Sequence, residues 1–104
     1  MESSSWLYIK AHGVPIRLSL ERWFHITEEH SEMAGLYFDI LETVENPEAI
    51  YEGKTGELLA VKELENGKYI VVVYRELSSE DGFIITAFLT RRKRQLERRR
   101  KIWP

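Results

Sequence analysis

The histidines of the segment HITEEHSEM, residues 25–33, are the first candidates for chemistry in this chain. His25 and His30 lie five positions apart and enclose two carboxylates, Glu28 and Glu29. Histidine titrates near neutral pH, so it can both donate and accept a proton there. The segment is therefore consistent with a metal site, with acid–base catalysis, or with the ordinary surface of a helix.

Metal binding is the weakest of these three interpretations. Two histidines that share a metal on one helix are four positions apart, as in H-E-x-x-H. Side chains five positions apart on a helix point about 140° away from each other. His12, the third histidine, lies in a predicted turn, and nothing in the sequence brings it closer. We therefore expect no metal site and no cofactor.

The helical period places the two histidines in different environments. His30 shares an apolar stripe with Trp23 and Ile26, so we expect it to point toward a sheet. His25 falls on the polar side, within reach of the carboxylates three and four positions later. A plainer interpretation stays open for each: a core histidine with one hydrogen bond for His30, and a solvated surface residue for His25.

Three polar side chains interrupt apolar strands farther along the chain. Arg75 follows the run YIVVVY and by alternation shares a face with the valines two and four positions before it. Thr86 is expected on the face of Ile84 and Phe88, and Lys62 interrupts LLAVKEL. Arginine clamps phosphate through two hydrogen bonds, so these residues suit an anion site. The alternative is ordinary: threonine is common in strands, and long cations can extend to solvent at a sheet edge.

Hydrophobic periodicity and turn signals predict the elements that must position these residues. Ser19 is a predicted N-cap, Asn46-Pro47 ends the second helix, and Asn66-Gly67 is a strong hairpin signal. The expected elements are a hairpin over residues 6–19, helices over 20–34 and 37–47, and strands over 57–64, 68–77 and 82–90.

This order of elements predicts an α+β fold. An N-terminal hairpin and two helices would pack on one face of an antiparallel β-sheet, followed by a basic C-terminal helix or tail. The run YIVVVY is apolar at successive positions, which predicts a central strand buried on both faces. We expect a single domain over residues 1–104, with a core of about residues 6–90 and a basic segment over 91–104.

Charge is strongly segregated along the 104 residues, although the net charge is only −2. The segment 91–104 holds eight cations against one acid, whereas the other ninety residues hold seven cations against 16 acids. The eight cations are Arg91, Arg92, Lys93, Arg94, Arg98, Arg99, Arg100 and Lys101. Such a segment suggests a polyanion as a partner, or a protein with an acidic surface. A solvated helix at the chain end would show the same pattern.

Composition narrows the compartment and the chemistry. The chain has no cysteine, which excludes disulfides, thiolate catalysis and zinc sites built on sulfur. The start, MESSSWLYIK, lacks the apolar core of a signal peptide, and no apolar run is long enough for a membrane helix. We therefore expect a cytoplasmic protein that does not contact membranes.

Four segments in order, ERWFHITEEHSEM, NPEAI, YIVVVYRE and GFIITAFLTRR, resemble small prokaryotic and phage-associated proteins of the barnase–EndoU–colicin–RelE (BECR) nuclease superfamily. The resemblance covers residues 16 to about 92. It depends on the H-x(4)-H helix, the N-P turn and a last strand containing T-A-F. It implies helices packed on an antiparallel sheet of about four strands, and a toxin-type ribonuclease that is held by an antitoxin and cleaves RNA without a metal.

In such a reaction the 2′-OH attacks the adjacent phosphate, which requires an acid–base group and stabilisation of negative charge. The resemblance assigns roles to five residues: His30 and then His25 as general acid or base, Arg75 and Lys62 as phosphate stabilisers, and Thr86 as a phosphate hydrogen-bond donor. The chain has E-H-S-E where the group usually has R-H-P-E, so one arginine that could contact phosphate is missing.

Two other functions remain as alternatives to a ribonuclease. The first is a non-catalytic nucleic-acid-binding module that uses the basic segment. The second is a protein–protein interaction module in which the basic segment docks an acidic partner and Trp6, Trp23 and Trp103 serve as anchors.

Overall fold

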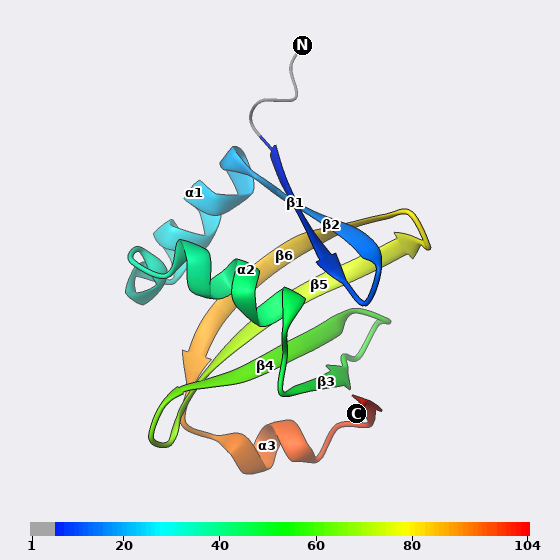
Figure 1. Ribbon diagram of the computed structural model, residues 1–104. Helices are drawn as coiled ribbons and strands as arrows, with labels where there is room; N and C mark the ends of the chain where they lie inside the picture. Colours follow the sequence, from blue (N-terminus) through cyan, green and yellow to red (C-terminus); the bar gives the residue numbers. More distant parts are fainter. Residues whose placement is uncertain (1–5) are drawn as a thin grey trace.

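Seven strands join into one curled mixed sheet in the computed structural model, which describes residues 6–104 (Figure 1). The strands are β1 (Trp6–Ala11), β2 (Val14–Ser19), β3 (Ala49–Glu52), β4 (Leu58–Glu65), β5 (Lys68–Ser78), β6 (Asp81–Thr90) and β7 (Lys101–Trp103). Their order across the sheet is β1-β2-β6-β5-β4-β3-β7. All pairs are antiparallel except β2 and β6, which run parallel and meet at Arg17 and Phe83.

The helices are short. They are α1 (Leu20–Glu29), the 3₁₀ turn η2 (Ser31–Met33), α2 (Tyr37–Glu45) and α3 (Lys93–Glu97). The predicted N-cap is confirmed, because the Ser19 hydroxyl oxygen accepts a hydrogen bond of 3.1 Å from the Arg22 N–H. The first helix ends five residues earlier than predicted, at Glu29. His30 leaves helical geometry there, with φ −134° and ψ 77°.

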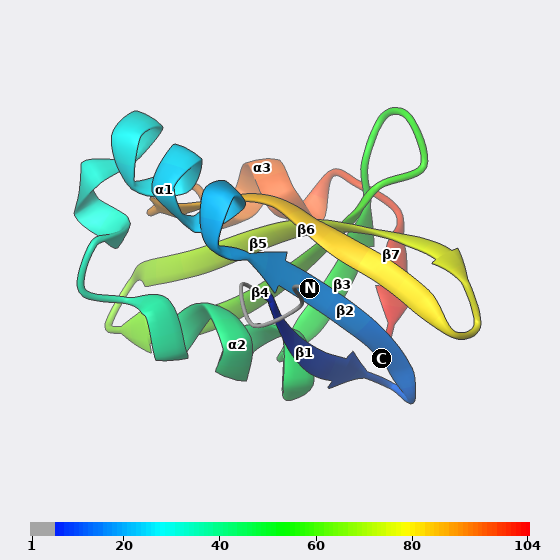
Figure 2. The same cartoon turned by 90° about the horizontal axis from the view of Figure 1, so that it is seen from above.

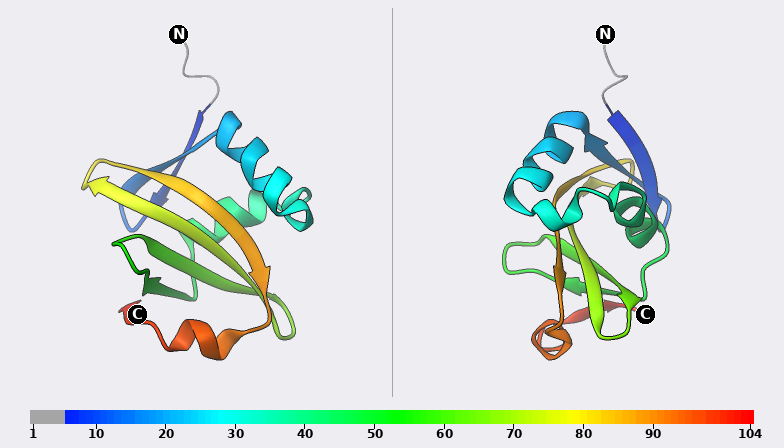
Figure 3. Two further views of the ribbon diagram at one scale, coloured as in Figure 1. Left: turned by 180° about the vertical axis from the view of Figure 1, so that it is seen from behind. Right: turned by 90° about the vertical axis from the view of Figure 1, so that its left-hand side faces the viewer.

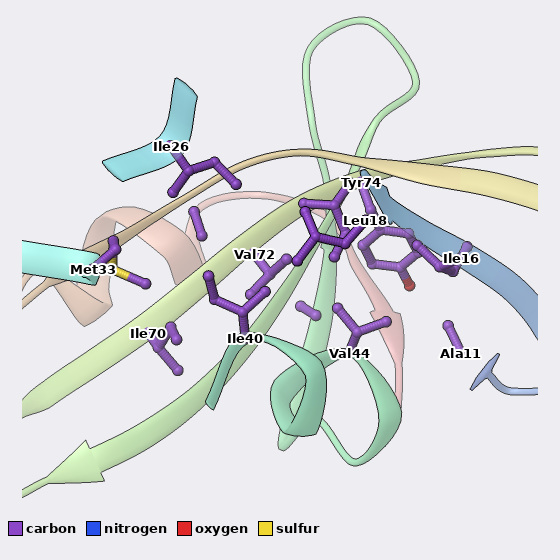
Figure 4. Close-up of a cluster of buried hydrophobic side chains, with 13 residues drawn as sticks. Ala11, Ile16, Leu18, Ile26, Met33, Ile40, Val44, Ile70, Val72 and Tyr74 are labelled. Carbon is purple, nitrogen blue, oxygen red and sulfur yellow. The ribbon is translucent and has the colours of Figure 1, made fainter. Parts of the chain in front are cut away.

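Strand β5 carries the core on both of its faces, as its apolar run predicted. Ile70, Val72 and Tyr74 point toward α2 and belong to a cluster that we call the helix-side core (Figure 4). Tyr69 and Val71 point the other way, into a second cluster that we call the α3-side core. The helix-side core is completed by residues from α1, η2, α2 and the first hairpin, including Ile26, Met33, Ile40, Val44, Ile16 and Leu18.

The α3-side core shows why the chain continues past residue 90. Leu96 of α3 is buried against Tyr51 of β3, Leu59 and Val61 of β4, and Val71 of β5. These side chains leave the sheet on the side opposite α2, so they would face water without α3. The basic segment is therefore folded onto the sheet by one apolar residue and by the pairing of β7 with β3.

The predicted fold class is wrong. Nearly half of the chain is strand, and the seven-stranded sheet is mixed rather than antiparallel. The helices do not share one face: α2 and α3 lie on opposite faces, and α1 lies along the edge of β6, where β2 diverges from it (Figures 1 and 2). The prediction failed because β3 and β7 are short and because the parallel contact of β2 with β6 joins distant residues.

One extra residue in β6 changes the expected alternation. Val73 of β5 pairs with Thr86, whereas Tyr74 pairs with Ile84, so Ile85 forms a β-bulge. Ile84 consequently lies in the helix-side core, and Thr86 lies on the other face. The prediction that Ile84 and Thr86 share a face is wrong for this reason.

The sheet curls enough to bring distant parts of the chain together (Figure 3). The ring of His12, in the β1–β2 turn, lies 4.8 Å from the ring of Trp103 in the edge strand β7. Trp23 packs edge-on against Tyr37, with ring centroids 5.1 Å apart. The Trp6 side chain, the remaining predicted anchor, lies outside what the structure describes. Within residues 6–104, no helix has the length and apolar character needed to cross a membrane.

Candidate nucleic-acid interface

The most promising surface lies on the α3 side of strands β5 and β6. We call it the Phe88 face and define it by the half-buried side chains Val73, Arg75, Thr86, Phe88 and Thr90. Cross-strand pairing places Phe88 opposite Val71 and Thr90 opposite Tyr69. The face therefore runs from Arg75, at one end of the strands, to the start of the basic segment at the other.

His30 lies at the edge of this face. Its ring centroid is 6.0 Å from that of Phe88, and the two planes are tilted by 37°. About a third of its side chain is exposed, and its Nδ1 is 3.6 Å from a carboxylate oxygen of Glu32. His30 thus reaches the sheet, as predicted, but it meets an aromatic ring at an open edge rather than the aliphatic core.

A pocket of about 120 Å³ opens beside Phe88. Thr90, Arg92, Gln95 and Arg99 contribute polar groups to its wall. The Arg92 N–H donates a hydrogen bond of 3.0 Å to the Thr90 hydroxyl oxygen, which fixes the turn out of β6. The pocket thus combines two guanidinium groups, a hydroxyl, an amide and an aromatic ring, which are the groups that bind phosphate and stack on bases.

Arg75 lies on the same face but not beside His30. It is four residues along β5 from Val71, the partner of Phe88, which separates the two backbone positions by about 13 Å. Its guanidinium donates a hydrogen bond of 3.3 Å to the Thr55 hydroxyl oxygen and lies 3.8 Å from Glu57. The β3–β4 loop therefore directs Arg75 away from the pocket.

Glu57 is the anchor of that loop. Hydrogen bonds from the Thr55 hydroxyl and from backbone N–H groups lower the pKa of Glu57 to about 2. Its carboxylate stays charged at neutral pH and holds the loop that contacts Arg75. Gly53 allows this packing, because a Cβ at that position would collide with the Glu57 side chain.

Two of the predicted catalytic residues lie elsewhere. Lys62 pairs with Ile70 on the helix side of the sheet, and its Nζ donates a hydrogen bond of 2.8 Å to Glu42 of α2. This contact lowers the pKa of Glu42. His25 is mostly exposed on α1, with its Nδ1 3.9 Å from Glu28. Lys62 therefore lies on the face of the sheet opposite Arg75, and His25 lies on the exposed side of α1.

Thr86 lies on the predicted face, yet its hydroxyl is closed to solvent. The oxygen is buried and has no hydrogen-bond partner among the described residues. A buried hydroxyl without a partner is unfavourable. In the conformation described, Thr90 offers the accessible hydroxyl instead.

The basic segment is only partly neutralised. Lys93 lies 3.9 Å from Glu97 and 5.6 Å from the Tyr69 ring, and these two groups raise its pKa. Arg100 lies 3.7 Å from Glu52. Five further guanidinium groups have no acidic partner in residues 6–104: Arg91, Arg92, Arg94, Arg98 and Arg99.

Three of these guanidinium groups, those of Arg91, Arg92 and Arg94, line a second, wider depression of about 640 Å³ next to the β4–β5 turn. It is lined by Gly67, Tyr69 and most of the stretch from Arg91 to Glu97. Together the two pockets form a continuous cationic surface around α3, because Arg92 and Gln95 line both.

Sequence reasoning missed Phe88, Thr90 and Gln95 as members of the site. Phe88 and Thr90 looked like ordinary strand residues, and only their position two apart, directly before the basic segment, could have drawn attention to them. Gln95 was missed because it is an uncharged residue in a segment in which only the cations were considered. Among the described residues, no three His, Asp or Glu side chains are grouped so that they could hold a metal ion.

Comparison of the chain with models of protein families, with curated proteins and with solved structures finds no match. The resemblance to the BECR superfamily stays a prediction. Any function must therefore be inferred from the residues and geometry of this chain.

Proposed function

We propose that this protein binds single-stranded RNA across the Phe88 face and the cationic surface around α3. The observation that carries the proposal is the pocket beside Phe88, where Arg92 and Arg99 flank a half-buried aromatic ring. Aromatic rings stack on unpaired bases, and guanidinium groups neutralise the phosphates between them.

The charge pattern supports RNA over an uncharged ligand. Five guanidinium groups without an acidic partner in the described chain lie on one short segment. Each phosphate that they neutralise releases condensed counterions, which favours binding at low salt. The proposal includes a cytoplasmic location, where such RNA is available.

Cleavage of the bound RNA is the second candidate function, and one observation favours it. His30 contacts the same Phe88 ring that lines the pocket, so an acid–base group and two guanidinium groups flank one aromatic side chain. Acid–base catalysis requires a group within hydrogen-bond reach of the proton that moves. A nucleotide stacked at Phe88 would bring its ribose close to His30.

In that reaction neutral His30 takes the proton from the 2′-OH, and the 2′-oxygen bonds to phosphorus. The bond from phosphorus to the 5′-oxygen breaks, and that oxygen takes a proton from the His30 imidazolium or from water, which yields a 2′,3′-cyclic phosphate and a 5′-OH end. Arg92 or Arg99 would stabilise the additional charge on the phosphate oxygens. The centre differs from the predicted one, because Arg92 and Arg99 take the place of Lys62 and Arg75.

Fluorescence anisotropy with a labelled single-stranded RNA tests the binding proposal. We expect Arg92→Gln/Arg99→Gln to weaken binding at least tenfold, because both guanidinium groups line the pocket. Arg22→Gln/Lys54→Gln removes the same charge from exposed positions elsewhere and is the matched control. Equal losses of affinity in the two double variants would mean that only net charge matters. Equal affinity for duplex and single-stranded RNA would contradict base stacking.

Incubation of the same RNA with EDTA present tests cleavage. We expect wild-type protein to produce 2′,3′-cyclic phosphate ends, His30→Gln to produce none, and His25→Gln to match wild type. Cleavage by His30→Gln at the wild-type rate would overturn the role of His30. Binding of RNA without any cleavage would support the RNA-binding function and refute the cleavage function.

A further inference from the structure

Helices α1 and α2 display an acidic surface that is also unusually apolar. Residues 20–46 hold seven Asp or Glu against one Arg. Three large apolar side chains stand among them with high exposure: Leu20 at 49%, Phe24 at 57% and Phe38 at 78%. We call Leu20, Glu21, Phe24, Phe38 and Glu45 the acidic–aromatic surface.

The two helices present this surface as one unit. The Trp23 ring packs against Tyr37, and Tyr37 packs against Phe38 with centroids 5.3 Å apart. These contacts join α1 to α2, so the exposed Phe38 ring lies at one end of a row of aromatic rings that begins at Trp23. Exposed aromatic residues ringed by charge are typical of protein–protein contact sites.

The chain itself contains a segment of complementary chemistry. Residues 91–104 carry eight cations against one acid, and Ile102 and Trp103 of β7 are 45% and 37% exposed. Phe38 and Glu45 belong to α2, which lies across the sheet from α3 (Figure 1). Within the described chain, the ion pairs of the basic segment involve Glu97 and Glu52, and none reaches α1 or α2.

We infer that the basic segment of one copy docks on the acidic–aromatic surface of a second copy. The two surfaces lie on different parts of the molecule, so the contact is head-to-tail, and each added copy leaves one surface of each kind free. Association therefore grows beyond a dimer as concentration rises. RNA competes with it, because both occupy the basic segment, but the inference does not depend on RNA binding.

Sedimentation equilibrium of the RNA-free chain tests the inference at low salt. We expect the average mass to rise past that of a dimer as the concentration is raised to about 1 mM, which requires a dissociation constant of about 1 mM or lower for the contact. Raising the salt to about 0.3 M should weaken association at least tenfold, since the pairs are exposed. A monomer throughout would overturn the inference, as would a dimer that does not grow and is insensitive to salt.

Charge reversal gives the sharper test. Glu21→Lys/Glu45→Lys and Arg94→Glu/Arg98→Glu should each be monomeric alone, and mixing them should restore association because opposite charges again face each other. Glu76→Lys/Glu80→Lys is the matched control, since both residues are exposed near the β5–β6 turn, away from the proposed contact.

The control should self-associate like wild type. Loss of association in the control, to the level of Glu21→Lys/Glu45→Lys, would show attraction by net charge alone and would overturn the head-to-tail contact, as would a mixed charge-reversed pair that stays monomeric. Circular dichroism of each variant establishes that it is folded before its mass is compared. RNA affinity, measured separately, keeps this result distinct from the fate of the RNA-binding proposal.

Discussion

The salt dependence of RNA binding should report how many arginines contact phosphate. The structure leaves five guanidinium groups of the basic segment without an acidic partner in residues 6–104. For single strands, the logarithm of the affinity falls with the logarithm of salt by about 0.7 per phosphate neutralised. Five contacts give a slope of about −3.5, so affinity should fall about 130-fold between about 50 mM and 200 mM salt.

Removing two of these contacts changes the slope by a fixed amount. Arg92→Gln/Arg99→Gln leaves three guanidinium groups and a slope of about −2.1, which is a fall of about 18-fold over the same salt range. The assay is anisotropy of a labelled single-stranded RNA at four or more salt concentrations. Arg22→Gln/Lys54→Gln should keep the wild-type slope, since neither residue belongs to the site.

Two measured slopes would contradict these contacts between arginine and phosphate. A wild-type slope near zero would mean that the arginines do not meet phosphates. An unchanged slope in Arg92→Gln/Arg99→Gln, together with weaker binding, would mean that these two side chains act through packing and not through charge.

Two further predictions concern the scaffold. Leu96→Ala should destabilise the protein by about 2 kcal/mol, because Leu96 is 6% exposed in the α3-side core, and urea denaturation measures the change; an exposed neighbour, Gln95→Ala, should stay within about 0.5 kcal/mol. The pKa of Glu57 is lowered from 4.5 to about 2, so its contribution to stability is present above pH 4.5 and is lost as pH falls toward 2. Glu57→Gln should therefore flatten the pH dependence of stability in this range, and an unchanged acid profile would contradict the hydrogen bonds assigned to its carboxylate.

Local signals predicted most of the individual elements. Ser19 begins α1 because its side chain caps the helix, and Asn66-Gly67 joins β4 to β5 because that pair suits a tight hairpin. The burial of β5 on both faces also followed from its unbroken apolar run. Each of these features depends on residues close together in the sequence.

The arrangement of the elements depended on contacts that no local signal reveals. Strand β2 meets β6 more than sixty residues later, and the four residues of β3 are too few to show a period. The bulge at Ile85 places Ile84 and Thr86 on opposite faces, because one inserted residue breaks the alternation between them. In the sequence, Leu96 is a single apolar residue in a basic segment, and no local signal indicates that it is buried in the α3-side core.

In the candidate site, too, local features could be predicted from the sequence and long-range contacts could not. Sequence reasoning directed His30 toward the sheet correctly, but its neighbour Phe88 is distant in the chain. Lys62 and Arg75 appeared equivalent as cations in strands. Only the pairing register separates them, since it places Lys62 beside Glu42 and Arg75 on the opposite face.

The most direct test of the central claim is an NMR titration of the ¹⁵N-labelled chain with a short single-stranded RNA. The largest amide shifts should fall on Phe88, Thr90, Arg92, Gln95 and Arg99, with smaller shifts at His30. With the chain dilute enough to be monomeric, amides of α2, on the other side of the sheet, should stay in place. Shifts concentrated on α2, or no shifts with RNA in excess at low salt, would contradict RNA binding across the Phe88 face.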